Sequence, residues 1–408
     1  MPKRVPKIRF KKYTDEWKED ILSEFLEVSK EKNFLGKYDK TDVLSVSGDC
    51  GIVNQIEHKG RSFAGASVAN YGVVDTGDVV YTKSPLLNTP YGIIKTNKGK
   101  PGIVSTLYAV YKPKENVDPN FIECYFEQNA RINNYLKPLV NKGAKNDMKV
   151  TDANALNGSV IFPKKDEQLN ISKCMNNIDE MINKISDKRN KLEDIKNALL
   201  RKMFPNDGKK VPQIRFKGYQ NLWEKCLLED YIIEYHEVTT ENNQYPILTS
   251  SRKGIFLQTD YYSGNQVASS DNTGYNVVPY GYFTYRHMSD DEIFHFNIND
   301  IVENGIVSTL YPVFTINEKM DSRYLQYQLN YGQEFAKYAI LQKQGGSRTY
   351  MYMSKIKKLS LTIPKSIKEQ RKISGYFMKL DQLSSLYLRK LNMLKNIKKS
   401  FLEQMFVN

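Results

Sequence analysis

One predicted loop near the end of the chain concentrates side chains that suit contact with a polyanion. Basic, amide and hydroxyl groups flank two glycines there, and two tyrosines follow. The residues are Lys343, Gln344, Ser347 and Arg348 around Gly345-Gly346, then Tyr350 and Tyr352. Arg and Gln can make two hydrogen bonds at once with the edge of one base, and glycine lets another backbone approach closely. This composition favours nucleic-acid binding over bond-making chemistry.

Loops at other positions carry similar residues. An earlier basic loop contains Lys142, Lys145, Asn146 and Lys149. Two further pairs of loops line up with each other, Ser47 to Cys50 with Ser250, Ser251, Arg252 and Lys253, and Thr82-Lys83 with Arg286-His287. Any single member could be an ordinary solvated surface residue. As a set they indicate nucleic acid, with Lys mostly on phosphates and Arg, Gln, Asn and Ser as candidate base readers.

Patterns typical of enzymes and metal sites are weak in this sequence. It contains neither GxxxxGK[ST] nor a strand-linked GxGxxG. Asn88-Thr89-Pro90-Tyr91 is more simply a turn than a methyltransferase motif, and Glu57-His58-Lys59 near Asp42 is a weak imitation of a nuclease site. The four His and four Cys show no ligand spacing. We therefore expect no catalytic residue, no metal and no cofactor in this chain.

Charge and hydropathy narrow the class of partner. The 408 residues carry a net charge of +14, which favours a polyanion, with nucleic acid ahead of an anionic membrane. No apolar run approaches the roughly 18 residues that a membrane span needs, and no signal-peptide core follows the N-terminus. These features predict a soluble, cytoplasmic protein that can bury large cores.

The sequence consists of two similar copies of one repeat. Val5-Pro6-Lys7-Ile8-Arg9-Phe10-Lys11 recurs as Val211-Pro212-Gln213-Ile214-Arg215-Phe216-Lys217, and Gly102 to Tyr108 recurs without change as Gly305 to Tyr311. β-Branched segments, a short helical stretch at 119–136 or 321–341, and a strand-like segment at 159–163 or 360–364 keep the same order in both copies. A repeat of this length predicts two similar β-rich globules.

Each globule is followed by one long predicted helix. In residues 168–203 the apolar positions step by threes and fours, the spacing of a coiled-coil seam, and the same register returns from Ile373 to Met405. Several seam positions are polar or only partly apolar, namely Arg189, Lys196, Ser384, Tyr387 and Lys398. Since such residues are seldom buried without a partner, we expect these positions to be partly open and to be places where other subunits dock.

Connectivity predicts the architecture. The first helix ends at Phe204 and a turn-rich breaker leads directly into the second globule, so the second helix must return antiparallel to the first. The expected fold is α+β, with two β-rich globules joined by two long antiparallel coiled-coil helices in a circular pseudo-twofold repeat. The expected boundaries are residues 1–164 and 205–364 for the globules, and 165–204 and 365–408 for the helices.

The second helix is also strongly basic. Residues 365–408 hold ten Lys or Arg against three acidic residues, which is half of the net charge of the chain. Such a helix could follow DNA phosphates, could face a partner subunit, or could be an ordinary solvated face.

This pattern resembles the specificity (S) subunits of type I restriction-modification systems. Ile363-Pro364 with Glu369-Gln370-Arg371-Lys372-Ile373 is similar to the family's conserved-region entry, and Phe162-Pro163 through Glu167-Gln168 to Ile171 is a looser match. Residues 102–108 and their copy are similar to a segment of its target-recognition domains. The resemblance covers essentially the whole chain.

The resemblance implies a non-catalytic DNA-recognition subunit. Each globule would read one half of a bipartite double-stranded DNA site, and the helix pair would set the gap between the halves. Two modification (methyltransferase) subunits and restriction (motor-nuclease) subunits would assemble around it, with S-adenosylmethionine, ATP and Mg in those partners. The alternative is a helical scaffold with two β-rich ligand- or protein-binding domains. Strong salt dependence of duplex binding would separate the two readings.

Overall fold

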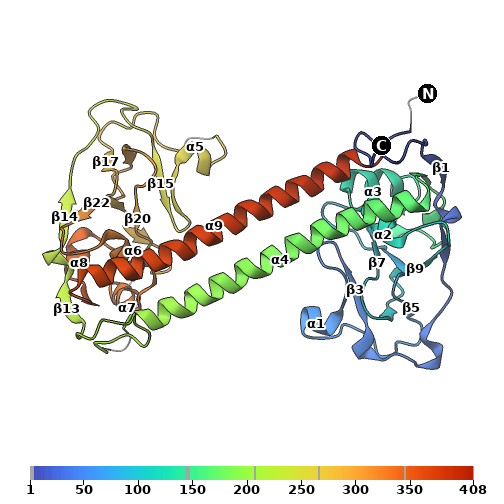
Figure 1. The fold of residues 1–408 in the computed structure, drawn as a ribbon, viewed down its shortest axis with the longest axis horizontal. Helices are drawn as coiled ribbons and strands as arrows, with labels where there is room; N and C mark the ends of the chain where they lie inside the picture. The colour runs from blue at the N-terminus through green and yellow to red at the C-terminus, as the bar shows by residue number, and fades with distance from the viewer. Residues whose placement is uncertain (1–3, 143–147, 206–207, 265–266, 344–345, 408) are drawn as a thin grey trace. The chain divides into compact units, whose positions relative to one another are not determined.

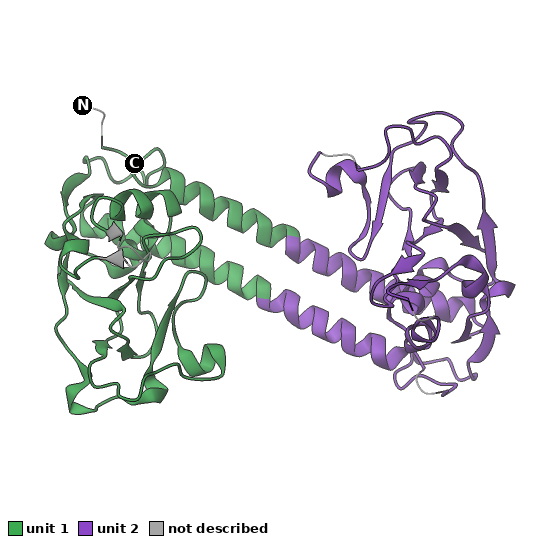
Figure 2. Cartoon of the chain, turned by 180° about the vertical axis from the view of Figure 1, so that it is seen from behind, with its two compact units in different colours: residues 1–186, 389–408 green, residues 187–388 purple. Residues whose placement is uncertain are grey.

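A computed structural model describes residues 4–142, 148–205, 208–264, 267–343 and 346–407. The chain forms two compact units, Met1–Ser186 with Arg389–Asn408 as unit 1, and Asp187–Leu388 as unit 2 (Figure 2). Each unit therefore combines one globule with a segment of each long helix. Both ends of the chain belong to unit 1, as a circular repeat requires.

Unit 1 is built around an antiparallel sheet of order β2-β9-β6-β7, of which β7 and β9 are labelled in Figure 1. The strands are β1 Lys18–Ile21, β2 Leu26–Val28, β3 Leu44–Ser47, β4 Gly51–Asn54, β5 Gly72–Val74, β6 Val79–Thr82, β7 Ile93–Thr96, β8 Gly102–Val104, β9 Tyr108–Pro113, β10 Asn141–Lys142, β11 Met148–Lys149 and β12 Ser159–Phe162. The helices of the globule are α1 Gln55–Lys59, α2 Pro119–Phe126 and α3 Asn129–Leu136. The remaining ladders pair β1 with β12, β3 with β4, β5 with β8 and β10 with β11.

Unit 2 repeats this plan with a sheet of order β14-β22-β18-β20. Its strands are β13 Glu224–Leu227, β14 Ile232–Tyr235, β15 Leu248–Ser251, β16 Gly254–Leu257, β17 Asn276–Pro279, β18 Phe283–Thr284, β19 Met288–Ser289, β20 Asn297–Ile298, β21 Asn304–Val307, β22 Val313–Ile316, β23 Thr349–Tyr350 and β24 Ser360–Ile363. Its helices are α5 Gln258–Tyr261, α6 Ser322–Tyr331, α7 Gln333–Leu341 and α8 Met353–Lys357. The end strands β13 and β24 pair as β1 and β12 do in unit 1.

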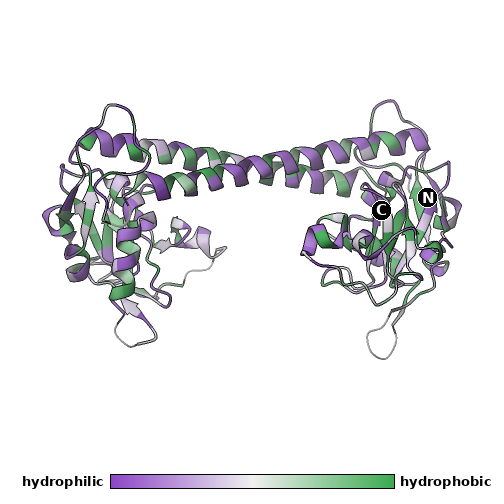
Figure 3. Cartoon of the chain, turned by 90° about the horizontal axis from the view of Figure 1, so that it is seen from below, coloured by the Kyte–Doolittle hydropathy of each residue, from purple (hydrophilic) through white to green (hydrophobic). Residues whose placement is uncertain are grey.

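The two long helices are α4 Lys165–Met203 and α9 Ile367–Gln404. Within unit 2, Lys196 pairs with Asp381 and Glu193 accepts a hydrogen bond from Ser384. Residue numbers therefore fall along α4 as they rise along α9. The helices are therefore antiparallel, as predicted. Hydrophobic and hydrophilic positions alternate along both, which is the pattern of a helix that buries one stripe (Figure 3).

A buried ion pair fixes the repeated N-terminal segment of each unit to its long helix. The Arg9 guanidinium donates from Nε and Nη2 to the Glu167 carboxylate, both at 2.7 Å. In unit 2 Arg215 donates to Glu369 at 2.7 and 2.9 Å. The Glu of the Glu-Gln pair at each helix start is thus a structural anchor. Bidentate geometry and burial make such a pair strong once both partners are present.

The Gln of the same pair closes the junction between helix and globule. Gln168 accepts a hydrogen bond from the Asp118 amide at 2.9 Å and donates to the Pro163 carbonyl at 2.9 Å. Asp118 caps α2, so this side chain joins the strand end, the cap and the long helix. Gln370 repeats the contacts with the Asp321 amide and the Pro364 carbonyl at 2.8 and 2.9 Å.

The chain ends confirm the circular repeat. The Ile8 amide donates to the Gln404 carbonyl of α9 at 2.9 Å, and the Ile214 amide donates to the Lys202 carbonyl of α4 at 2.9 Å. Met405 and Phe406 then pack into the core of unit 1. The first segment of the chain therefore follows the end of α9 just as its copy follows the end of α4.

The identical heptapeptide serves the fold in both units. Its apolar residues, such as Ile103 and Ile306, are fully buried in β8 and β21. A Cβ on Gly102 would lie 2.5 Å from the Asp42 carbonyl oxygen, and one on Gly305 would lie 2.4 Å from a Leu248 methyl carbon. A Cβ would therefore clash with neighbouring backbone at Gly102 and with the Leu248 side chain at Gly305.

The short helical stretch of each globule is broken in two, which differs from the single helix expected at 119–136 and 321–341. In unit 2 the break falls at Gly332, where a Cβ would lie 2.4 Å from the Gln328 carbonyl oxygen. In unit 1 the chain turns at Glu127 and Gln128 between α2 and α3. A two-helix corner can wrap around the aromatic core more closely than one straight helix.

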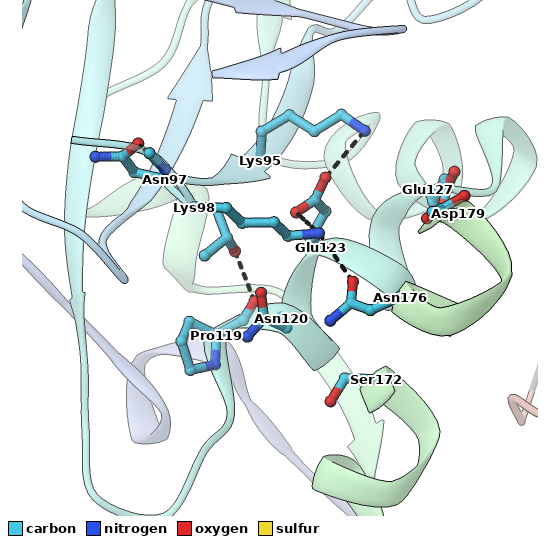
Figure 4. A network of polar contacts seen from close by, with 12 residues as sticks. Lys95, Asn97, Lys98, Pro119, Asn120, Glu123, Glu127, Ser172, Asn176 and Asp179 are labelled. Atoms are coloured by element: carbon cyan, nitrogen blue, oxygen red, sulfur yellow. Dashed lines mark hydrogen bonds and ion pairs between the residues drawn. The ribbon is translucent and has the colours of Figure 1, made fainter. Parts of the chain in front are cut away.

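A polar network ties the sheet of unit 1 to α2 and α4 (Figure 4). Glu123 of α2 forms ion pairs with Lys95 at 3.4 Å and with Lys98 at 3.0 Å. Lys98 also donates to the Asn176 side chain of α4 at 3.1 Å.

Among the described residues, no helix is long and apolar enough to span a bilayer.

Candidate nucleic-acid interface

The loops of unit 2 that were predicted to bind nucleic acid meet at one acidic segment. This segment, residues 290–292, follows β19. Each of its three acidic side chains pairs with one predicted cation, and the pairs are Asp290 with Arg348, Asp291 with Arg252 and Glu292 with Lys343. The three cations come from two segments far apart in the sequence. The structure therefore brings the predicted basic residues together, as one shared surface would require.

Arg252 lies in the turn between β15 and β16, and both of its terminal nitrogens donate hydrogen bonds to Asp291. Its Nη1 donates to Asp291 Oδ2 at 2.8 Å, and its Nη2 donates to the other oxygen of the same carboxylate. Ser289 Oγ also donates to Asp291, at 2.8 Å. The hydrogen bond from Arg252, with that from Ser289, holds the pKa of Asp291 well below its usual range. The acid therefore stays charged at neutral pH.

Arg348 is held differently. Its Nε donates to Asp290 Oδ1 at 2.8 Å, and its Nη1 lies 4.0 Å from Met288 Sδ. Lys343 Nζ lies 2.5 Å from Glu292 Oε1. Arg348 and Lys343 are each about half exposed, with side-chain exposures of 49%. Both cations lie at the surface, where phosphate could compete with the acids.

Three rings lie beside these cations. The His287 ring stacks on Tyr352 with centroids 5.2 Å apart, and Tyr350 stacks on Tyr352 at 5.8 Å. Met288 and Tyr350 are paired between β19 and β23, which fixes the rings to the loop that carries the acids. Tyr350 and Tyr352 are exposed. Exposed aromatic faces next to cations suit contact with bases and sugars.

Arg286 and Lys253 supply charge without an acidic partner. Both side chains are exposed, and neither forms an ion pair with another residue that the structure describes. Arg286 lines a polar pocket of about 260 Å³ together with Ser250, Arg252, Tyr261, Tyr262 and Asp290. The pocket is large enough for a small anionic group, and its rim carries both signs of charge.

The serines of this region are not loop residues, which corrects the sequence prediction. Ser250 is buried in β15, its Oγ donates to the Thr284 carbonyl at 3.2 Å, and Asn297 donates to it at 2.8 Å. Ser251 ends the strand, and its Oγ donates to the Gly254 carbonyl at 3.1 Å. Alternation along β15 turns Ser250 inward. Any contact of these serines with DNA stays a prediction.

In unit 1 the structure places Lys83 and Ser47 of the corresponding loops. Lys83 pairs with Asp152 at 2.5 Å. Ser47 lies in β3 and its Oγ accepts the Cys50 amide at 3.3 Å, so it too belongs to a strand. A hollow of about 680 Å³ adjoins it and is lined by residues that include Ser47, His58, Lys59, Leu87, Asn88 and Tyr108.

Part of the predicted surface cannot be placed. Lys145, Asn146 and Gln344 lie outside the described residues. The backbone of Lys142 and Lys149 forms the β10–β11 ladder, and their side chains are not described. Ser347 is exposed in the segment that leads to β23. These six residues remain predicted contacts.

The sequence prediction missed the acidic partners. Asp290, Asp291 and Glu292 stand next to Arg286 in the sequence, and Asp152 follows the basic loop of unit 1. An acidic run within a set of cations was a visible signal, but its pairing depends on loops that only the fold brings together.

In the described part of the chain, no group of three His, Cys, Asp or Glu side chains could hold a metal ion.

Two of the five polar positions of the helix seam are more closed than predicted. Lys196 is buried, as is Ser384, whereas Arg189, Tyr387 and Lys398 are half-buried. Pairing explains the closure, because Lys196 pairs with Asp381 and Ser384 donates to Glu193. Lys398 contacts Glu127 at 2.5 Å and Asp179 at 2.6 Å. Burial lowers the pKa of Lys196, but the hydrogen bond to Asp381 and the nearby Tyr331, Asp381 and Glu193 together outweigh this, and the net shift is upward.

The fold matches solved structures of one kind. A type I restriction-modification system S subunit from M. genitalium aligns over 99% of this chain and 99% of its own, with 13% identity and a TM-score of 0.57. The HsdS subunit from Thermoanaerobacter tengcongensis aligns over 96% and 97%, with 15% identity and a TM-score of 0.43. A chain from a structure on "complex assembly" and "conformational transition of the type I R-M system" aligns over 96% and 97%, with 15% identity and a TM-score of 0.48.

No family model and no curated protein matches the sequence. Over nearly its whole length, the chain is similar in fold to the type I S subunit from M. genitalium. At 13% identity, this similarity shows the fold alone.

Proposed function

We propose that this chain is the DNA sequence-recognition subunit of a type I restriction-modification complex. Each globule reads one half of a bipartite, asymmetric double-stranded DNA site, and the helix pair sets the gap between the halves. The observation that carries this proposal is the duplication itself. Two units with the same sheet order and the same buried Arg–Glu and Gln–Asp anchors share the fold of an S subunit.

The duplication supports two readers of different sequence. Similar globules repeated in one chain favour two half-sites in inverted orientation, as in dimeric DNA-binding proteins. The surface residues of the two units differ, so the half-sites should differ as well. Arg252 and Arg348 carry the guanidinium groups suited to base edges, whereas exposed Lys253 suits phosphates.

Partner subunits complete the proposed complex. Two modification subunits dock on the long helices, and half-buried Arg189 and Tyr387 are candidate contacts of α4 and α9. Lys196, Ser384 and Lys398 stay candidates in a supporting role, since their acidic partners already hold them. Methyl transfer and cleavage, with S-adenosylmethionine, ATP and Mg, belong to the partner subunits. This chain itself performs no catalysis.

Selection from a random duplex pool tests the proposal. The full chain with its modification subunit should enrich two short motifs separated by an unspecific gap of roughly one helical turn. Recovery of duplexes without any shared motif at physiological salt would refute sequence recognition. A single uninterrupted motif would refute two readers.

A pair of variants links the selected motif to the proposed surface. Arg286→Ala should weaken duplex binding because Arg286 is exposed beside the reading loops. Lys319→Ala is the matched control, since it removes the same charge from an exposed position between β22 and α6. Equal losses for both variants would assign the effect to net charge alone.

Binding of the wild type should also fall steeply with salt, which a scaffold that binds sugars or proteins would not show.

A further inference from the structure

Two neighbouring acids in unit 2 engage two arginines through different atoms. Asp291 occupies both terminal nitrogens of Arg252, whereas Asp290 takes only the Nε of Arg348. A guanidinium reads guanine with two parallel N–H groups on one edge. The edge that an acid occupies therefore decides which edge of an arginine is left to read a base.

Arg252 is closed in this arrangement. The edge formed by Nη1 and Nη2 faces Asp291, and Ser289 and the Ile293 amide hold that carboxylate in place at 2.8 and 3.3 Å. Asp291 is thus a fixed counter-ion with its own support. DNA must displace it before the edge formed by Nη1 and Nη2 of Arg252 can contact a phosphate or a base.

Arg348 is open. Asp290 holds the guanidinium by its Nε at 2.8 Å, and the contact of Nη1 with Met288 Sδ is a weak one at 4.0 Å. Among the described residues, no acid binds the terminal nitrogens of Arg348. They remain available as a two-donor fork while the Nε contact limits rotation of the side chain.

We propose that Asp290 is a positioning residue that holds Arg348 ready to read one guanine, while Asp291 masks the Nη1–Nη2 edge of Arg252 until DNA displaces it. The proposal rests on the proposed function and specifies how unit 2 performs it. The equivalent connection of unit 1, residues 83–92 between β6 and β7, contains no Asp or Glu. The device is therefore confined to one of the two readers.

The proposal predicts opposite effects for two changes of equal charge. Asp290→Asn removes the charge that holds Arg348 and leaves only a weaker neutral acceptor, so Arg348 rotates more freely and discrimination at one G·C position should fall by about fivefold, the most that one exposed ion pair supplies. Asp291→Asn unmasks Arg252, so affinity for unselected duplex should rise by about fivefold with the selected motif unchanged. Each variant is the control of the other, because both add the same charge at adjacent positions.

Selection from a random duplex pool measures both effects and requires no assumption about the target sequence. The wild-type chain, Asp290→Asn and Asp291→Asn are each assembled with the modification subunit and selected in parallel, and affinity for the unselected pool is measured at one salt concentration. Thermal unfolding of each variant confirms that unit 2 remains folded. Loss of one guanine from the motif of Asp290→Asn alone supports the proposal.

Two further variants separate positioning from mere structural support. Asp290→Glu retains the charged carboxylate and should restore the guanine preference, and Arg348→Lys should lose it because a lysine has no two-donor fork. Equal changes in Asp290→Asn and Asp291→Asn, with the motif intact in both, would overturn the proposal. A wild type that enriches no motif would instead overturn the proposed function, so the two failures are distinguishable.

Discussion

The two units agree where they meet the long helices and differ where they face outward. Arg9–Glu167 and Arg215–Glu369 have nearly the same geometry, with 2.7 Å the shortest contact in each pair. The connection after β6 in unit 1, residues 83–92, contains no acid and leaves Leu87 97% exposed, whereas the connection after β18 in unit 2 contains Asp290, Asp291 and Glu292. Duplication has kept the part that attaches a globule and changed the part that could contact a target.

This difference teaches where specificity can vary without harm to the fold. The anchors use buried side chains whose partners come from fixed elements, so a change there leaves a charge unpaired. The loops use exposed pairs that contribute little to stability. A globule could therefore acquire a new surface while its attachment remains the same.

The largest expected effect comes from exchange of one globule. Replacement of residues 231–356 by the equivalent segment of another protein of this fold should change one half-site completely and leave the other unchanged. The segment excludes Arg215 and Glu369, so that anchor survives the exchange, and the donor must keep a backbone N–H at position 321 for the Gln370 junction. Motif selection measures the outcome. A change in both half-sites would show that the units do not read independently.

Removal of an anchor should cost more stability than any loop change. Glu369→Ala leaves Arg215 buried without its acid and also removes the acceptor of Trp223 Nε1, which lies 3.3 Å away. We expect a loss of about 3–5 kcal/mol in the unfolding free energy of unit 2. Glu167→Ala should cost slightly less in unit 1, because Trp17 Nε1 has no hydrogen-bond partner among the described residues.

Denaturant unfolding of the two anchor variants tests this order. Glu180→Gln is the control, since its pair with Lys184 is exposed and should contribute about 0.3 kcal/mol. A loss in Glu369→Ala no greater than in this control would show that the buried pair does not hold the globule to the helix.

The glycines of the identical heptapeptide should respond unequally to the same change. A Cβ at Gly102 meets the Asp42 carbonyl, which is backbone and cannot move alone, whereas one at Gly305 meets the side chain of Leu248, which can rotate. We expect Gly102→Ala to cost about 3 kcal/mol and Gly305→Ala about 1 kcal/mol. Thermal unfolding of both variants measures the difference, and equal costs would show that the two sites are equally rigid.

The smallest effect is a pH response confined to unit 2. Burial, together with Arg252 and Lys196, lowers the pKa of His295 below its usual 6.5. The unfolded chain therefore binds a proton more readily, so this contribution to stability is present above about pH 6.5 and is lost as the pH falls toward the lowered pKa. Unfolding of the wild type at pH 7 and pH 5, compared with His295→Gln, measures it. An identical pH response in the variant would exclude His295 as the source.

The duplicated plan could be predicted from the sequence because periodic patterns and repeats are local signals. The seam from Ile171 to Met203 predicts a long helix, and its copy predicts the partner and the direction. The break at Gly332 could not be predicted, because it depends on how the helix meets the aromatic core. The inward direction of Ser250 depends on the register of β15, which one residue would reverse.

The candidate surface could be predicted as a set of cations but not as a set of pairs. Arg252, Lys343 and Arg348 stood out by residue type and by position in matched loops. Their acidic partners are residues 290–292, which the fold brings to them from a different loop. Charge pairing across loops is a property of tertiary structure, so sequence alone overstated the free positive charge of this surface.

The central claim is that two units of one chain read two halves of one DNA site. Mapping of methylated bases across the genome of a cell that expresses this chain with its modification subunit tests it most directly. We predict methylation within a bipartite sequence whose two different halves flank an unspecific gap of roughly one helical turn. Methylation at an uninterrupted sequence, or methylation that does not depend on this chain, would contradict the account.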